Sequence, residues 1–349
     1  MKSASLTLLF IIGSFLTGWS ELTQSALDKK ASAAVDLEIK DDTNVADVLE
    51  FLGEEPAMHR IMYNEEQVRQ GEEIVKYGRT TRNGKRSKRV SKHYACTSCH
   101  NVEREDPVLW ESNPDTRLDY VKKKGLPFLQ GTTFKGIANR ESWYNDDYVK
   151  KYGTDKIELA HGDLREATQL CAVECAQGRP MKMWEMDAVL AYYWSLQYTL
   201  ADLDMSTEEL DNFSEMIQEN KTEESIKFLK SKYFQQSPAN FFDSPPDKSV
   251  GYEGLQGDPV RGRDIYDLSC QHCHQPDGVS HYVMDNSKMT FRQLKRNITK
   301  DSHFSLYQII AYGTYALPGH RPYMPHYPIE RMSLQQVEDL RAYIEQEAQ

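Results

Sequence analysis

Two short peptides in this chain contain the residue types that covalent haem attachment requires. In each, two cysteines flank a pair of residues and a histidine directly follows the second cysteine, the pattern C-x-x-C-H. Two thiols at this spacing form thioethers with one porphyrin, and the histidine then serves as proximal ligand of the iron. Neither copy has the second C-x-x-C or H-x-x-x-H that a zinc site would need. We therefore predict two covalently attached haem c groups. The attachment residues are Cys96 and Cys99 with His100, and Cys270 and Cys273 with His274.

The sixth ligand of each iron decides what that haem can do. Met324 stands beside Pro325 in a proline-containing loop that precedes the last predicted helix. Histidine plus methionine raises the reduction potential and closes the iron to substrates. We therefore predict that His274 and Met324 bind the second iron, which then transfers electrons only. If Met324 instead fills the core, the remaining candidates are Met284, Met289, His320 and His326.

The upstream haem has no methionine at the corresponding distance. In the second half of the chain, Met324 precedes Tyr343, the aromatic residue of the final helix. Counting the same number of residues back from Tyr192 leads to the segment between Cys171 and Cys175. Met181 and Met183 lie nearer to Tyr192, at or inside the start of the helix. A cysteine thiolate stabilises ferric iron and lowers the potential, so electrons are expected to run from the first haem to the second. A disulfide or a pair of inert buried thiols are the alternatives.

A larger repeat surrounds the two motifs and indicates the elements that position them. Before each motif, a helical pattern contains a glycine followed three residues later by isoleucine, at Gly71 and at Gly262. After each motif, an amphipathic helix contains Ala-Tyr, with the aromatic residue at Tyr192 and at Tyr343. A glycine lets the second helix approach closely, and the aromatic ring fills the crossing. This arrangement resembles class I cytochrome c domains, in which the haem lies between two such helices.

The predicted fold is all-α, with two class I cytochrome c domains joined by a partly helical linker. Residues 1–20 contain one lysine and an apolar stretch too short to span a bilayer comfortably, which predicts a signal peptide and a periplasmic location. The cleavage site is left open, and an uncleaved membrane tether is the alternative. The remaining predicted parts are a leader at 21–64, domain 1 at 65–200, the acidic linker at 201–257 and domain 2 at 258–349.

The charge of the chain restricts its partners. A net charge of −11 argues against nucleic acid, because a phosphate backbone would be repelled. One segment, residues 79–92, opposes the trend with a cluster of arginines and lysines just before Cys96. Such a segment attracts a small anion or an acidic redox partner, or it is simply a solvated loop.

Residues 164–180 and the helix after them resemble the ligand segment of bacterial dihaem thiosulfate dehydrogenases and of the related SoxA subunit of the sulfur-oxidising system. In that family an arginine precedes the ligating cysteine, a glycine follows seven residues on, and a helix with Glu-Met and Ala-Tyr closes the domain. Cys171 and Gly178 have this spacing. The resemblance implies that Cys171, rather than Cys175, binds the iron. Cys175 itself and the loosely matching residues 131–144 depart from the family pattern.

The resemblance implies a reaction in which two thiosulfates are coupled to tetrathionate and two electrons are released, one for each haem. Cys171 would hold a sulfur-bound intermediate, and Arg179 would bind the substrate oxyanion. Arg165 and Arg140 are weaker candidates, and each arginine suits a haem propionate equally well. The expected electron acceptor is a small redox protein or a terminal oxidase. Two other functions stay open: a dihaem electron carrier without its own substrate, and a SoxA-like subunit that loads thiosulfate onto a carrier protein.

Overall fold

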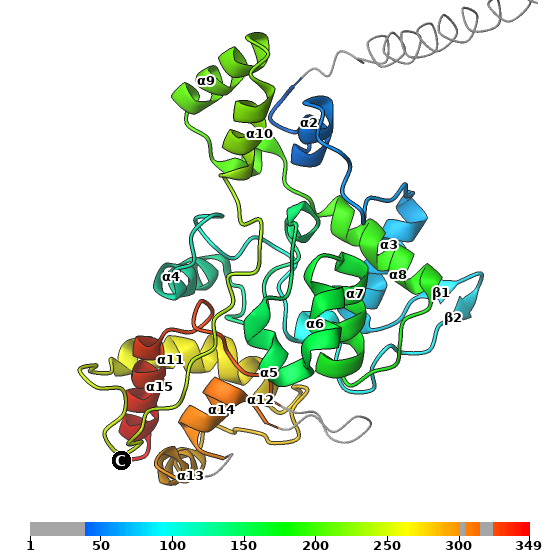
Figure 1. The fold of residues 1–349 in the computed structure, drawn as a ribbon. Helices are drawn as coiled ribbons and strands as arrows, with labels where there is room; N and C mark the ends of the chain where they lie inside the picture. Colours follow the sequence, from blue (N-terminus) through cyan, green and yellow to red (C-terminus); the bar gives the residue numbers. More distant parts are fainter. Residues whose placement is uncertain (1–38, 301–303, 315–323) are drawn as a thin grey trace, which may run out of the picture.

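The computed structural model describes residues 39–300, 304–314 and 324–349. These residues are mostly helical, as predicted, and one two-stranded hairpin is their only sheet (Figure 1). None of their helices is long and apolar enough to cross a membrane. The predicted signal peptide and the fallback ligand His320 lie outside the described residues.

Helices follow one another along nearly the whole described chain. They are α2 (Val45–Phe51), α3 (Glu65–Tyr77), α4 (Pro114–Lys124), α5 (Val149–Tyr152), α6 (Thr154–His161), α7 (Leu164–Leu170), α8 (Met183–Ser195), α9 (Thr207–Gln218), α10 (Thr222–Lys230), α11 (Pro259–Ile265), α12 (Gln271–His274), α13 (Lys288–Ile298), α14 (Leu306–Tyr312) and α15 (Leu334–Glu347). The strands are β1 (Thr81–Arg82) and β2 (Lys85–Arg86), and the π-helical turns are Cys171–Cys175 and Tyr266–Cys270.

The first of two close helix crossings pairs α3 with α8. Asn64 begins α3 in a reciprocal capping box with Gln67. At the crossing, a Cβ atom on Gly71 would lie 1.9 Å from the carbonyl oxygen of Ala188 and 2.9 Å from Cβ of Tyr192. Only glycine allows the two backbones to come this close, so the predicted role of Gly71 is confirmed.

The second crossing pairs α11 with α15 in the same manner. Asp258 caps α11, and Pro259 occupies its first turn. A Cβ atom on Gly262 would lie 1.9 Å from the carbonyl oxygen of Asp339 and 2.8 Å from Cβ of Tyr343. In both pairs the contacted carbonyl stands one helical turn before the tyrosine. The repeat in the sequence therefore corresponds to two crossings of one geometry.

Alanine at Gly71 or Gly262 is expected to force the paired helices apart. Overpacking of this kind destabilises a protein by about 1–3 kcal/mol, which would appear as a lower urea midpoint in far-ultraviolet circular dichroism. Gly162→Ala is the matched control, because a Cβ atom there would meet nothing within 4 Å. Equal midpoints for Gly71→Ala and Gly162→Ala would show that the crossing tolerates a methyl group.

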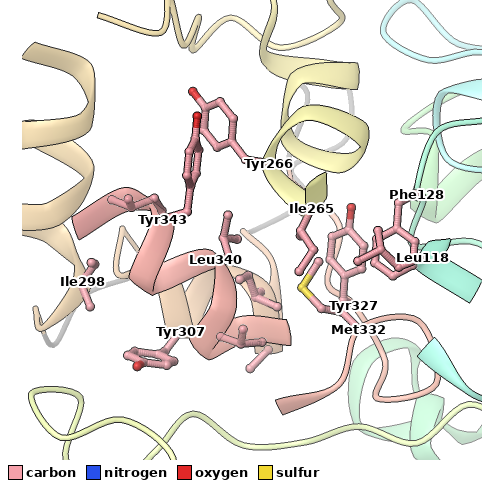
Figure 2. Close-up of a cluster of buried hydrophobic side chains, with 14 of the residues drawn as sticks. Leu118, Phe128, Ile265, Tyr266, Ile298, Tyr307, Tyr327, Met332, Leu340 and Tyr343 are labelled. Carbon is pink, nitrogen blue, oxygen red and sulfur yellow. The ribbon is translucent and has the colours of Figure 1, made fainter. Parts of the chain in front are cut away.

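Helix α4 belongs to the first half of the sequence but packs on the second pair of helices. Its Leu118, together with Phe128 beyond its end, lies in one buried cluster with Ile265 of α11 (Figure 2). On the surface, the ammonium of Lys122 lies 2.7 Å from a carboxylate oxygen of Asp264. The two predicted domains therefore share part of a hydrophobic core.

The predicted leader and linker also pack against each other, in the lobe formed by α2, α9 and α10 (Figure 1). Val48 and Leu49 of α2 are buried with Phe213 of α9 and Leu229 of α10. An amphipathic stripe on each helix explains this burial, since a single short helix cannot cover its own apolar face.

The basic segment before the first haem motif forms the hairpin β1–β2. Asn83 and Gly84 both have positive φ values at its turn, the conformation that two-residue hairpin loops favour. The strand residues are exposed, which agrees with a solvated loop, and the guanidinium of Arg82 lies over the ring of Trp184.

Candidate functional site

The first C-x-x-C-H motif lies in the wall of a cavity of about 220 Å³, which Cys96, Cys99 and His100 help to line. The Nδ1–H group of His100 donates to the backbone oxygen of Thr132 at 2.6 Å. Burial lowers the pKa of His100 and so favours the neutral ring. A neutral imidazole has one N–H, so this hydrogen bond leaves Nε2 with a lone pair. That is the state a metal-ligating histidine requires.

The second motif repeats this arrangement. The Nδ1–H group of His274 donates to the backbone oxygen of Tyr282 at 2.6 Å. A smaller cavity, of about 60 Å³ among the described residues, is lined by Cys270, Cys273, His274 and Met324. The structure therefore brings together the four residues predicted for the second haem.

The surroundings of His100 leave its ring one orientation. A Cβ atom on Gly131 would lie 2.6 Å from the imidazole and 2.7 Å from the carbonyl oxygen of Cys99. The ring of Phe134 stacks on His100 with centroids 4.7 Å apart, and Tyr193 stacks on Phe134 in turn. A fixed imidazole with two nearby thiols in a mostly apolar cavity fits a covalently bound haem. Among the described residues, no group of three or more His, Cys, Asp or Glu side chains is arranged to hold a bare metal ion.

Besides Cys96 and Cys99, three sulfur side chains line the same cavity: Cys171, Cys175 and Met181. The two cysteines stand at the ends of one π-helical turn, and their free thiols are hydrogen bonded to each other. Met181 lies before α8 rather than inside it, so the structure adds a methionine that counting along the sequence had set aside. Met183 is 79 % exposed.

The surroundings of Cys175 favour a thiolate more than those of Cys171. The sulfur of Cys175 lies 3.2 Å from the hydroxyl of Tyr152 and 3.9 Å from that of Tyr144. The hydrogen bond from Cys171 lowers the pKa of Cys175, as do these hydroxyls and the charge of Lys151. The same bond, with burial, raises the pKa of Cys171. The protein's own groups therefore favour a thiolate at Cys175 over one at Cys171, whereas a ferric ion at Cys171 would favour deprotonation of that thiol instead.

The structure does not bring Arg179 into the cavity. Its guanidinium donates to both carboxylate oxygens of Glu185, at 2.7 and 2.6 Å, and to two backbone carbonyls. Arg165 is similarly paired with Asp187 at 2.8 Å, and neither arginine is among the lining residues. Of the three arginines proposed from the sequence, only Arg140 lines the cavity.

A buried charge network joins this cavity to the second half of the chain. Arg331, which lines the cavity, is paired with Glu105, whose side chain is fully buried. Arg117, also fully buried, lies 3.5 Å from the other oxygen of Glu105 and donates to the backbone oxygen of Arg331 at 2.6 Å. Burial opposes ionisation of Glu105, but the charges of Arg331 and Arg117 outweigh it and hold its pKa below the ordinary value.

The remaining end of the first cavity is lined by residues that the sequence did not single out as a site. Tyr144, Tyr148 and Tyr152 recur at four-residue spacing, and their rings contact one another. The ammonium of Lys151 donates to Nδ1 of His326 at 2.6 Å. The tyrosine spacing was a visible signal. Nothing in the sequence places His326, a fallback ligand for the other haem, beside Lys151.

The two haem motifs contact each other. The thiol of Cys273 lies 3.9 Å from the backbone oxygen of Ser98. Cys99 lines both cavities, and Tyr94 and Gln130 from the first half of the chain also line the second one. The two attachment sites are therefore neighbours.

Comparison with known proteins identifies the second half of this arrangement. No curated protein and no solved structure matches the chain significantly. Residues 259–347 match the family model of cytochrome c. The match runs from the start of α11 into the end of α15, so it includes the Gly262 crossing, the second motif and Met324. The match supports a cytochrome c domain at residues 259–347, with covalently bound haem and an electron-transfer function.

Proposed function

We propose that the chain is a dihaem cytochrome. In it, Cys96, Cys99 and His100 hold one haem c, in addition to the haem c bound within residues 259–347. The observation that carries this proposal is the repeated site geometry. Both motif histidines donate from Nδ1 to a backbone carbonyl at 2.6 Å, and each half of the chain has the same glycine-dependent helix crossing. A bound haem supplies one-electron redox chemistry at its iron. The protein's own part is to attach the group and to orient the imidazole.

The purified protein is expected to contain two covalent haems per chain, measured by pyridine haemochrome absorbance and by intact mass. The Cys96→Ser/Cys99→Ser double variant should retain one haem, because the second motif is unchanged. Cys270→Ser/Cys273→Ser is the matched control and should also retain one. A wild-type protein with a single haem would contradict the proposal.

The proposed iron ligands are His100 with Cys171 at the first site and His274 with Met324 at the second. The support is that each pair lines one cavity. Thiolate lowers a haem potential and thioether raises it, so the first site is the proposed electron donor to the second. Contact between the two motifs gives this transfer a short path.

We further propose that the first site oxidises a sulfur anion such as thiosulfate. Joining two thiosulfates forms one S–S bond and releases two electrons without a proton. The larger cavity supports a substrate: beyond its attachment residues it offers thiols, tyrosine hydroxyls and the cations of Lys151, Arg140 and Arg331. Covalent haem and the apolar stretch within residues 1–20 support export to the periplasm, where a small redox protein or a terminal oxidase would accept the electrons.

Anaerobic addition of thiosulfate is expected to reduce the oxidised protein, observed as growth of its reduced haem absorbance bands and formation of tetrathionate. A dihaem carrier without its own substrate is the second candidate, favoured by one observation: Arg179, which the family resemblance offers as the oxyanion ligand, is occupied by Glu185. Reduction by ascorbate without any reduction by thiosulfate would decide for the carrier.

A further inference from the structure

We propose that the end of the first cavity formed by Lys151, His326 and Tyr152 binds the oxygen atoms of a small sulfur oxyanion. This inference rests on the proposed function of the first site and names the residues that hold its substrate. All three side chains line the cavity, and the ammonium of Lys151 donates to Nδ1 of His326 at 2.6 Å.

The tautomer of His326 carries the argument. An ammonium group can only donate, so Nδ1 of His326 is the acceptor and the neutral ring has its proton on Nε2. His326 is only 8 % exposed, and its Nε2 atom is buried without a hydrogen-bond partner among the described residues. A buried N–H group without an acceptor is unfavourable. An oxygen atom of a bound anion would satisfy it.

The neighbouring polar groups also suit an anion. The hydroxyls of Tyr152 and Tyr144 lie 3.2 and 3.9 Å from the sulfur of Cys175, so two hydroxyl groups lie beside a cysteine sulfur at this end. Donors placed beside thiols match thiosulfate, which has oxygens that accept hydrogen bonds and a terminal sulfur that reacts. Lys151 and His326 both offer N–H groups as donors. They can therefore bind the oxyanion in place of Arg179, which does not reach the cavity.

Two carboxyl groups line the same cavity but are engaged elsewhere. Asp106 lies 3.6 Å from the guanidinium of Arg331. Glu330 accepts from the backbone N–H of Asn240 at 3.1 Å, and burial raises its pKa. Both carboxyl groups therefore have partners of their own, and neither accepts a hydrogen bond from Nε2 of His326.

The proposed site is assembled from three distant parts of the sequence. Lys151 belongs to α5, whereas His326 lies on the loop that follows Met324. The ring of Phe241, from the linker, packs edge-on against His326 with centroids 4.4 Å apart. Substrate binding at the first site therefore requires the second half of the chain and the linker to be in place.

Isothermal titration of the oxidised holoprotein with thiosulfate, and separately with sulfate, tests this site. The dissociation constant is expected to rise about 10- to 100-fold in Lys151→Met and in His326→Phe, as expected when a charge-assisted hydrogen bond is lost. His326→Gln keeps an N–H donor and should recover part of the affinity. Lys150→Met, at the exposed neighbouring lysine, is the matched control and should bind as the wild type does.

The outcomes separate this inference from the proposed function. Binding that is lost in both variants supports the site even if the wild type is never reduced by thiosulfate, a result that would overturn only the oxidation. Wild-type reduction rates in both variants would overturn the site and leave the oxidation standing. The site is also overturned if the wild type binds neither anion. It is overturned as well if the variants keep wild-type affinity but shift the reduction potential of the first haem in the absence of anion, since the residues would then contact a haem propionate.

Discussion

Cys171→Ala is expected to abolish reduction of the cytochrome by thiosulfate and to remove the thiolate-ligated low-spin signal from its low-temperature electron paramagnetic resonance spectrum. Both effects have one cause, because the proposed role of Cys171 is to bind the first iron and to receive the substrate sulfur. Thiolate and thioether ligation give distinct g-value spreads, so the signal of His274 with Met324 serves as an internal standard. Reduction by ascorbate should persist through the second haem.

Cys175→Ala and Met181→Leu are the matched controls for that experiment. Both side chains line the same cavity as Cys171, and each has a sulfur atom that is able to bind iron. They are expected to keep the thiolate signal, with Cys175→Ala altering the substrate reaction through its contact with Tyr152. Loss of the thiolate signal in Cys175→Ala, with retention in Cys171→Ala, would assign the ligand to Cys175 and contradict the family-based choice.

Glu105→Leu is expected to destabilise the folded protein by about 3–5 kcal/mol, the usual cost of removing one partner from a buried ion pair. The variant leaves Arg117 and Arg331 without their shared counter-charge, and both guanidinium groups are nine-tenths buried or more. The measurement is the urea midpoint of the holoprotein. Because Arg331 lines the first cavity, the absorbance of the haem proposed for that cavity should change in the same urea unfolding transition.

The control for Glu105→Leu is Glu72→Gln, which breaks a surface pair with Lys76 whose side chains are 41 % and 35 % exposed. Exposed pairs contribute little, so its midpoint should stay near that of the wild type. If Glu105→Leu is no less stable than Glu72→Gln, the buried network does not hold the two halves of the chain together.

The same carboxylate predicts a dependence of stability on pH. The pKa of Glu105 is lower in the folded protein than in the unfolded chain, so its contribution is complete above the unfolded value, about 4.3. That contribution is lost as the pH falls through the folded value, because the unfolded chain then binds the proton more readily. Glu105→Gln cannot titrate at this position. Below about pH 4.3, wild-type stability should therefore decline more steeply than that of Glu105→Gln.

Features that depend on a few consecutive residues were predictable from the sequence. Covalent haem attachment needs only two thiols and a histidine within five positions, and the family match at residues 259–347 agrees with that prediction for the second motif. The helix crossings were also predictable, because a glycine on one helix and an aromatic residue on its partner are typical of two helices that pack closely. Gly71 and Gly262 both occupy such contacts.

The tertiary structure decided which chemical groups share a cavity. Arg179 was the expected oxyanion ligand, but its guanidinium donates to both carboxylate oxygens of Glu185 in the next helix. His326 lies beside Lys151 in a fold whose two halves also meet in the core shared with α4 and in the buried pair of Glu105 with Arg331. A short motif contains its own spacing, since covalent geometry limits how far its residues can separate. Contacts between distant segments depend instead on how many helices pack at once, and no local pattern carries that information.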